Sequence, residues 1–174
     1  MNNLVFKSVV SKKLKAKEIV NICKLKNTYW KYNLKSQLKW FKEKIKKDDF
    51  HNLVYLKKKL IGYNLLRKRT FILNKKKKNY LYFDTLIVSK KYRNKKVGNL
   101  LNIFIVRIIK KSKLHSMLIC KKKSVNFYKK FNWKKISKKN FKIIDHIYPI
   151  SYLGMFLNQN KILSKNKVEY FIYN

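Results

Sequence analysis

The chain has 174 residues, of which 46% are hydrophobic and 15% aromatic, so it fits one domain over residues 1–174 with enough apolar material for a core. That composition excludes a chain that is disordered throughout. Its 46 lysines and arginines stand against 7 acidic residues, and the formal charge of +39 predicts attraction to anionic ligands, nucleic acid or acidic membranes.

Targeting segments, membrane spans and cysteine-based sites find no support in the sequence. The N-terminus has no apolar core of signal-peptide length, and the apolar run over residues 100–109 is interrupted by Asn102 and Arg107. Cys23 and Cys120 are far apart and lack the spacing of a metal site or a disulfide framework. We therefore expect a cytoplasmic protein without a metal.

The first half of the chain predicts two helices between a first strand and a group of three. Residues 3–10 read as a strand, whereas residues 15–30 and 33–50 space their apolar side chains at helical intervals. Residues 51–73 predict two strands around a lysine turn, and residues 74–89 a lysine-rich loop followed by a third strand. Three consecutive strands indicate an antiparallel meander.

A helical period follows the third of these strands. The apolar positions have the spacing of a helix packed against a sheet, and they are Val97, Leu100, Leu101, Phe104, Ile105 and Ile108. Shorter elements come next, in the order strand, helix, strand and last strand: residues 115–121, 124–132, 133–137 and 167–174. Residues 137–161, which contain the only proline, Pro149, predict no clear element.

A basic turn joins the strand that ends at Val88 to this helix. The first turn of a helix has unpaired N–H groups and the positive end of the helix dipole, which together favour an anion. Arg93, Lys95 and Lys96 flank the turn, and Gly98 has no side chain to keep a phosphate from the backbone. We therefore predict a pyrophosphate site. The alternative is that Gly98 only begins a helix among solvated lysines.

The stretch "LIVSKKYRNKKVGNLL" resembles the acyl-CoA-binding motif of the GNAT superfamily of N-acyltransferases, Gln/Arg-x-x-Gly-x-Gly/Ala. Arg93 fits its first position and Gly98 its last, while Lys96 replaces the middle glycine. The resemblance implies that acetyl-CoA is the cosubstrate and that the strand end and the turn hold it. The implied residues are Ile87, Val88, Arg93, Lys95, Lys96, Val97, Gly98 and Asn99.

A second stretch, "SVNFYKKFNW", is similar to the family's Ala-x-x-Phe-Tyr-x-Lys-x-Gly-Phe. The match implies that Phe127 belongs to the CoA site and that Tyr128, near the CoA sulfur, is the general acid for the leaving thiolate. A phenol suits this role because it stays neutral at cellular pH and can donate a proton. Packing is the structural alternative for Tyr128. Asn132 replaces the glycine, and asparagine tolerates a left-handed helix end.

Together the two motifs imply the GNAT fold, an α/β (α+β) architecture with a mixed, mostly antiparallel central sheet of six to seven strands flanked by about four helices. The implied reaction is acetyl transfer from acetyl-CoA to a primary amine. Asp84 falls where some members carry the carboxylate that receives the amine proton, although a salt bridge with Arg67, Arg69 or a neighbouring lysine would also explain it. Asp145 and His146 are candidates for a base or for acceptor contacts, and a capping or turn role is the structural alternative.

The acceptor of the acetyl group is predicted from the net charge and from a sequence similarity that is weaker than the two motif matches. The positive charge disfavours polyamines and basic peptides, and it favours an amine that carries phosphate, such as a nucleotide-linked amino sugar. Residues 25–69 also resemble the leading region of acetyltransferases of surface-polysaccharide sugars. The positions that carry this similarity are Trp30, Gln37, Trp40, Asp49 and His51.

Two other functions stay open at this point. Lysine runs at residues 57–59, 75–78 and 121–123 fit a nucleic-acid- or ribosome-associated binding protein. A GNAT fold that binds CoA without turnover is the other alternative, because Lys96 and Lys121 depart from the family motifs. The sequence also leaves a homodimer open.

Overall fold

The computed structural model divides by its contacts into two compact units. The described residues are 3–149, 151–157 and 167–173. The first unit comprises Met1–Arg67 and Thr85–Ile105, and the second comprises Lys68–Asp84 and Val106–Asn174. In the ranges described, no helix is long and apolar enough to cross a membrane.

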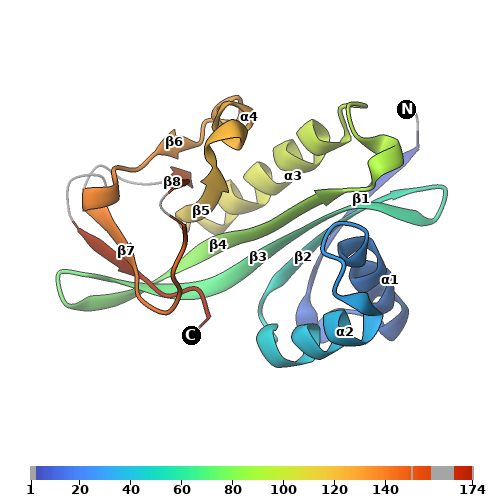
Figure 1. The fold of residues 1–174 in the computed structure, drawn as a ribbon, viewed down its shortest axis with the longest axis horizontal. Coiled ribbons are helices and arrows are strands. Elements are labelled where there is room, and N and C mark those ends of the chain that lie inside the picture. Colours follow the sequence, from blue (N-terminus) through green and yellow to red (C-terminus); the bar gives the residue numbers. More distant parts are fainter. Residues whose placement is uncertain (1–2, 150, 158–166, 174) are drawn as a thin grey trace. The chain divides into compact units, whose positions relative to one another are not determined.

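The first unit is built on strands in the order β1-β2-β3-β4 (Figure 1). These strands are β1 (Leu4–Val10), β2 (Phe50–Leu56), β3 (Lys59–Leu73) and β4 (Lys76–Val88), and the outer parts of β3 and β4 belong to the second unit. β1 pairs antiparallel with β2, from Leu4↔Leu56 to Val10↔Phe50, and β2 pairs antiparallel with β3. The predicted first strand and the two strands around the lysine turn are therefore confirmed.

Two-residue turns close the β2–β3 and β3–β4 hairpins. The backbone φ angles are 46° and 64° at Lys57 and Lys58, and 51° and 61° at Asn74 and Lys75. Two successive positive φ angles are typical of the type I′ turn, which matches the twist of a hairpin. The predicted lysine-rich loop before the third strand is wrong, because β4 begins at Lys76 directly after this turn.

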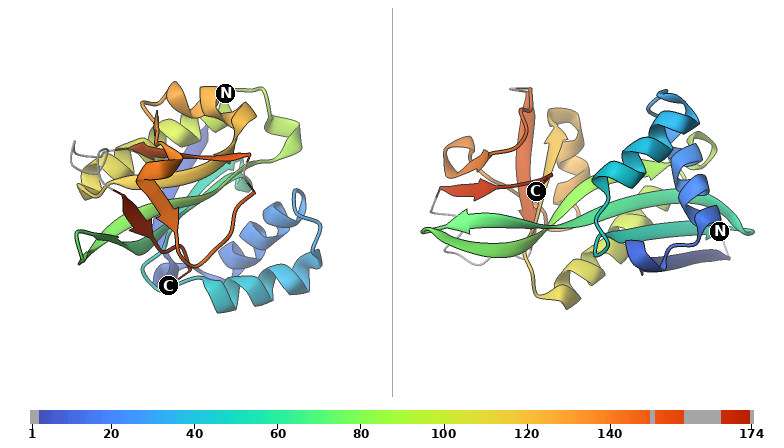
Figure 2. Two further views of the ribbon diagram at one scale, coloured as in Figure 1. Left: turned by 60° about the vertical axis from the view of Figure 1, so that its left-hand side comes forward. Right: turned by 90° about the horizontal axis from the view of Figure 1, so that it is seen from below.

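Helices α1 (Ala16–Asn27) and α2 (Asn33–Lys44) pack against the strands of the first unit (Figure 2). Their apolar faces meet the sheet in one buried cluster, which contains Ile22, Cys23, Phe41, Leu53, Leu65 and Ile87. Both helices were predicted from the spacing of apolar residues, and both are confirmed. The cluster includes Ile87 near the end of β4, so these helices support the strand that leads into the basic turn.

Helix α3 (Val97–Ser112) approaches β3 closely in the first unit. A Cβ atom at Gly62 would lie 3.4 Å from Leu101 Cδ2, so the glycine leaves room for the helix. Val97, Leu101 and Ile105 are buried as predicted, whereas Leu100 is 38% exposed. The predicted apolar stripe was therefore too wide at Leu100, since that position lies at the edge of the buried face.

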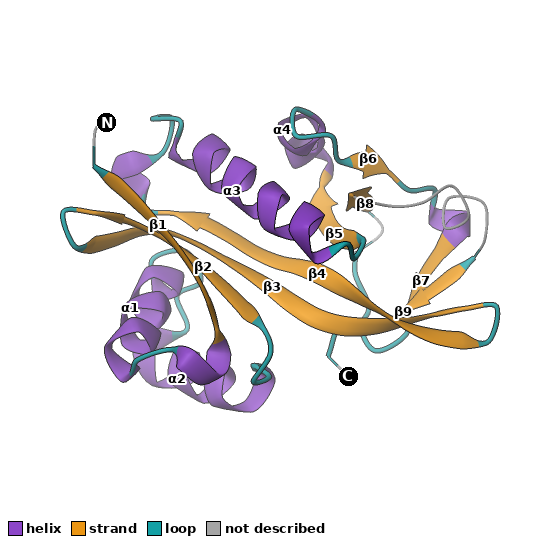
Figure 3. Ribbon diagram, turned by 180° about the vertical axis from the view of Figure 1, so that it is seen from behind, coloured by secondary structure: helices purple, strands orange, loops and turns teal. Residues whose placement is uncertain are grey.

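The second unit continues from β3 and β4 to β5, β8 and β6, with β9 paired to both β3 and β7 (Figure 3). Its elements are β5 (Ser116–Lys121), α4 (Val125–Lys129), β6 (Lys134–Lys135), β7 (Phe141–Ile143), β8 (Tyr152–Leu157) and β9 (Val168–Tyr170). β5 is parallel to β4, as a strand reached through a helical crossover must be, and antiparallel to β8. β7 and β8 lie in the segment for which the sequence predicted no element.

The predicted mixed α/β architecture is confirmed. The described residues contain four α-helices and nine strands in mostly antiparallel pairs, and β6, β7 and β9 have only two or three residues each. The organisation as a single domain stays a prediction.

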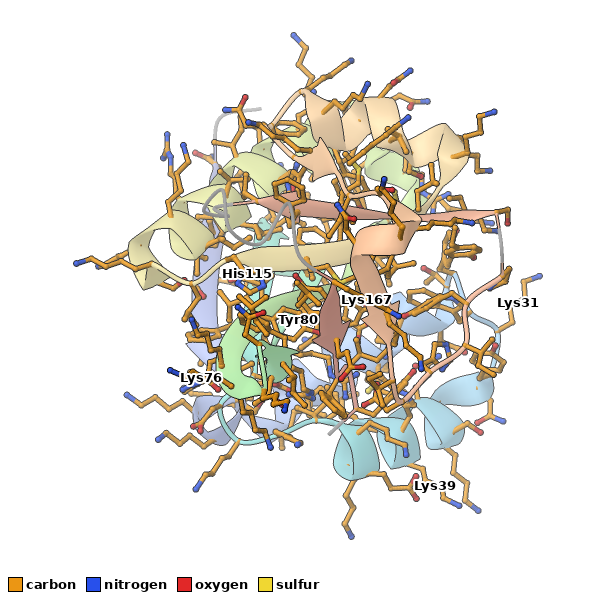
Figure 4. All side chains as sticks on the ribbon, turned by 90° about the vertical axis from the view of Figure 1, so that its left-hand side faces the viewer. Lys31, Lys39, Lys76, Tyr80, His115 and Lys167 are labelled. Carbon is orange, nitrogen blue, oxygen red and sulfur yellow. The ribbon has the colours of Figure 1, made fainter. Side chains whose placement is uncertain are left out.

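A buried histidine lies in an aromatic cluster of the second unit. His115 and Tyr80, both labelled in Figure 4, stack with ring centroids 5.5 Å apart and planes at 14°. The rings of Phe71 and Tyr170 meet His115 edge-on, at 4.5 and 5.8 Å. Burial lowers the pKa of His115 to about 4, so the folded state holds a neutral imidazole at pH 7.

Acidification is expected to destabilise the protein through this histidine. Because its folded pKa of about 4 lies below the ordinary 6.5, the stabilisation is complete above pH 6.5 and is lost as the pH falls toward 4. The full effect on the free energy of unfolding is roughly 3 kcal/mol. Denaturant titrations between pH 7 and 4 measure it. His115→Gln should show a shallower pH dependence, and an equally steep one would assign the acid sensitivity to other groups.

Candidate active site

The basic turn between β4 and α3 lies wholly within the first unit. β4 ends at Val88, the Ser89 N–H donates to the Ile61 carbonyl at 2.8 Å, and α3 begins at Val97. The Leu100 N–H donates to the Lys96 carbonyl at 3.0 Å, which closes the first helical turn. The amides of residues 97–99 precede this bond and have no acceptor within the helix, so they are available to an anion.

Two residues of the turn have the left-handed backbone that usually selects glycine. Asn94 and Lys96 both have φ of 59°. Lys96 stands where the acyl-CoA motif has its middle glycine, so the backbone geometry expected of a glycine is present although the residue is not. Gly98 has no positive φ. Its contribution is therefore the missing side chain at the helix start, next to the exposed cations Arg93, Lys95 and Lys96.

Replacing Lys96 with glycine is expected to stabilise the fold. A non-glycine residue in the left-handed region costs about 1–2 kcal/mol, and glycine costs about 0.5–1 kcal/mol in chain entropy. The net gain of up to about 1 kcal/mol should raise Tm by about 2–4 °C for a chain of this size. Lys95→Gly is the matched control because Lys95 has no positive φ, and it should lower Tm. Equal changes in Tm would contradict the strain at Lys96.

Arg93 is held by two contacts within the first unit. Its Nε donates to the Val88 carbonyl at 3.2 Å, and its guanidinium carbon lies 5.6 Å from the centroid of the Tyr29 ring. Tyr29 belongs to the connection between α1 and α2 and is 57% exposed. The sequence did not point to Tyr29, because 64 residues separate it from Arg93. These contacts keep the guanidinium beside the end of β4.

Tyr128 lies on α4 among aromatic side chains of the second unit. Its ring meets Phe83 edge-on at 5.7 Å, and its neighbour Phe127 at 5.1 Å. Burial, with a smaller contribution from Cys120, raises the pKa of Tyr128. The phenol therefore stays protonated, as a general acid must. At the end of the following turn Asn132 has φ of 65°, which confirms the left-handed position expected from the motif.

Asp84 lies on β4 in the second unit, half-buried, on the same strand as Tyr82. Tyr82 and Asp84 are two residues apart on this strand and therefore lie on the same face of it, and after burial the Asp84 charge is the next cause of the raised pKa of Tyr82. The Tyr82 hydroxyl in turn hydrogen-bonds to the Tyr148 hydroxyl at 2.5 Å. A salt bridge with Arg67, Arg69 or a neighbouring lysine stays an alternative role for Asp84, and these two arginines also donate to the Lys44 and Ile172 carbonyls.

The two candidate acceptor residues have different surroundings. The Asp145 carboxylate accepts from the Ile172 N–H at 2.8 Å and from the Tyr173 N–H at 2.7 Å, which ties down the C-terminal segment. His146 is exposed and lines a pocket together with Tyr148. The geometry gives Asp145 a structural role and leaves His146 available to a ligand.

The positions that resembled sugar acetyltransferases are mostly core residues of the first unit. Gln37 is 4% exposed and donates to the Trp30 carbonyl, and Asp49 is fully buried 3.9 Å from Arg67. His51 is fully buried between Ser11 and Tyr63, at 2.8 and 2.9 Å. These side chains are buried and interact with other residues of the protein, so they give no support to a sugar acceptor at these positions.

The predicted residues divide between the two units. Those from Ile87 to Asn99 lie on one continuous segment of the first unit, and the second unit holds Asp84, Phe127, Tyr128, Asp145 and His146. Among the residues with described positions, no three His, Cys, Asp or Glu side chains are grouped to hold a metal ion.

Comparisons with a family model and with solved structures show which known proteins this chain resembles. The family model described as "Acetyltransferase (GNAT) family" matches residues 18–133. ElaA of Escherichia coli superposes with a TM-score of 0.66 at 14% identity, over 88% of this chain and 99% of that one. YhbS of Escherichia coli, a GNAT family N-acetyltransferase in complex with CoA, gives 0.66 at 12% identity, over 98% and 92%.

A protein from a plant is also similar in structure to this chain. Naa50 of Arabidopsis thaliana, in complex with a bisubstrate analogue, gives a TM-score of 0.59 at 20% identity, over 88% of this chain and 97% of that one. At these identities the structures show a shared fold alone. No curated protein sequence matches the chain.

Proposed function

The chain belongs to the GNAT acetyltransferase family, whose model matches more than half of its residues, and we propose that it transfers an acetyl group from acetyl-CoA to a primary amine. The observation that carries the proposal is the β4–α3 turn. It combines first-turn helix amides that have no acceptor within α3, the left-handed backbone of Lys96 in the place of a motif glycine, and a guanidinium held at the end of β4. Each of these features suits a pyrophosphate.

Acetyl-CoA binds in this proposal along the end of β4 and at the start of α3. The amides of Val97, Gly98 and Asn99 face the pyrophosphate, and Arg93, Lys95 and Lys96 neutralise its charge. The backbone of Ile87 and Val88 holds the pantetheine arm and the thioester oxygen, and Phe127 contributes to the cofactor site. Such fixed contacts orient the thioester before the amine attacks it.

The chemistry requires a neutral amine and a protonated leaving group. The amine nitrogen attacks the thioester carbonyl, forming the C–N bond as the C–S bond breaks. Asp84 receives the proton that the amine gives up, directly or through water. Tyr128, whose phenol is protonated at neutral pH, donates its proton to the departing thiolate.

Charge gives the first restriction on the acceptor. With a formal charge of +39, the protein repels a polyamine or a basic peptide and attracts an amine that carries phosphate or carboxylate. A nucleotide-linked amino sugar is one such amine. The buried positions of Gln37, Asp49 and His51 remove one reason for preferring a sugar.

Release of free CoA tests the reaction. Acetyl-CoA is incubated with the protein and a primary amine, and the thiol is detected as it forms, with a reaction lacking amine as the control for hydrolysis. The proposal expects thiol release that depends on the amine and saturates with it. Tight binding of acetyl-CoA without release to any anionic amine would favour the non-catalytic alternative.

A further inference from the structure

A pocket of about 350 Å³ lies entirely within the second unit, between β5, β7 and the segment before β8. Most of its wall is apolar, and these residues are Ile119, Phe141, Ile143, Ile147 and Pro149. Ile147 is 92% exposed and forms the rim. An isoleucine so exposed beside a pocket favours an occupant with its own apolar surface.

The walls of this pocket are fixed by packing and hydrogen bonds. A Cβ at Gly154 of β8 would lie 2.7 Å from Phe141 Cζ, so the ring of Phe141 occupies the space that the glycine leaves. The Tyr148 hydroxyl, also in the lining, is hydrogen-bonded to that of the buried Tyr82. The Asp145 carboxylate anchors the backbone just before His146 to the C-terminal segment. The pocket is therefore preformed.

The polar groups of the pocket are cationic or neutral. They are Lys138, His146, Tyr148 and Tyr152, and no acidic residue is among the described residues that line it. The Lys121 ammonium adds positive charge, since it lies 5.9 Å from the centroid of the Tyr152 ring. Aromatic rings and branched aliphatic side chains favour a planar apolar group, and the lysines favour a negative charge on it.

The pocket also lies beside the candidate general base. Tyr148 lines the pocket, its hydroxyl is hydrogen-bonded to the Tyr82 hydroxyl, and Asp84 follows Tyr82 by two residues on β4, so that both side chains lie on the same face of the strand. A ligand that fills the pocket is thus separated from Asp84 by this pair of phenols. The arm of the ligand must therefore extend past both phenols to bring its amine to Asp84.

We propose that this pocket holds the non-reacting part of the acyl acceptor, an aromatic ring that carries a carboxylate or phosphate, while a flexible arm presents the primary amine to Asp84. The assignment rests on the proposed function and narrows it to aromatic amines with an anionic group. The mainly apolar wall disfavours a bare amino sugar, which needs more hydrogen-bonding partners than the pocket offers.

The binding part is tested without any catalysis. The probe is 4-ethylbenzoate, which has the ring and the carboxylate but no amine, and calorimetry measures its Kd. Lys138→Gln removes the cation of the wall, and Lys139→Gln removes its exposed neighbour, which does not line the pocket. We expect Kd to rise about tenfold in Lys138→Gln, and to change less than about twofold in Lys139→Gln. No binding, or equal weakening in both variants, would overturn the site.

The acceptor part is tested by thiol release from acetyl-CoA. Acceptors are 4-(aminoalkyl)benzoates with arms of two to six carbons, the matching phenylalkylamines without the carboxylate, and a UDP-linked glucosamine. We expect kcat/KM to be highest for the first, to fall about tenfold for the second, and Lys138→Gln to remove this difference. Preference for the nucleotide sugar, with no inhibition by 4-ethylbenzoate, would overturn the pocket and leave acetyl transfer standing. Binding of the probe with no transfer to any amine would instead overturn the proposed function.

Discussion

Gly98→Glu is expected to raise KM for acetyl-CoA by about 100-fold or more. The substitution places a carboxylate in the first turn of α3, directly where the proposal puts the pyrophosphate. Like charges brought together at a binding interface cost several kcal/mol, and about 1.4 kcal/mol corresponds to a tenfold change in affinity. Steady-state kinetics at a saturating amine concentration measure the change.

Gly98→Gln separates charge from size in this experiment. Glutamine has nearly the volume of glutamate but no charge, so it should raise KM for acetyl-CoA by a smaller factor. Both variants should unfold at temperatures near that of the wild type, because a helix tolerates either side chain better than glycine. An unchanged KM in folded Gly98→Glu would remove the β4–α3 turn from the cofactor site.

Tyr128→Phe is expected to lower kcat by about 100-fold or more with a change of less than about threefold in KM for acetyl-CoA, because general acid catalysis contributes about 10²–10⁴-fold. The phenylalanine keeps the ring contacts with Phe83 and Phe127 and removes only the hydroxyl. Because burial raises the pKa of Tyr128 above its ordinary value of 10.0, the wild type should also keep this acid protonated up to pH 10.

Tyr170→Phe is the matched control for the loss of a buried hydroxyl. Tyr170 is also buried in the second unit, and burial also raises its pKa, but its hydroxyl faces His115 at 3.3 Å. We expect this variant to lose some stability and to keep kcat. Full activity in Tyr128→Phe would exclude Tyr128 as the acid and would make it a packing residue.

Local patterns predicted the parts of the fold that depend on neighbours in the sequence. The change from strand to helix periodicity around the basic turn located the end of β4 at Val88 and the start of α3 at Val97. Asn132 was placed correctly in the left-handed region because asparagine tolerates it. The lysines at positive φ in the hairpin turns could not be predicted, since lysine has no preference for that geometry.

Contacts between residues that are far apart along the chain could not be predicted from local sequence patterns. β9 pairs with β3 through Phe71↔Tyr170, and nothing local specifies that register. The same holds for the cation–π contact of Arg93 with Tyr29 and for the hydroxyl pair of Tyr82 and Tyr148. For this reason the motifs predicted the residues of the cofactor site, whereas the pocket in the second unit could be found only in the structure, because the packing of distant segments forms it.

Calorimetric titration with acetyl-CoA tests whether the β4–α3 turn is the binding site of the cofactor. The protein is titrated at moderate salt with acetyl-CoA and separately with ATP, because ATP carries phosphates but lacks the pantetheine arm and the thioester. A cofactor site at the β4–α3 turn predicts saturable micromolar binding of acetyl-CoA, much weaker heats with ATP, and loss of acetyl-CoA binding in Gly98→Glu. Equal weak heats for both ligands, unchanged by the substitution, would contradict it and would reduce the turn to a basic surface that attracts any polyanion.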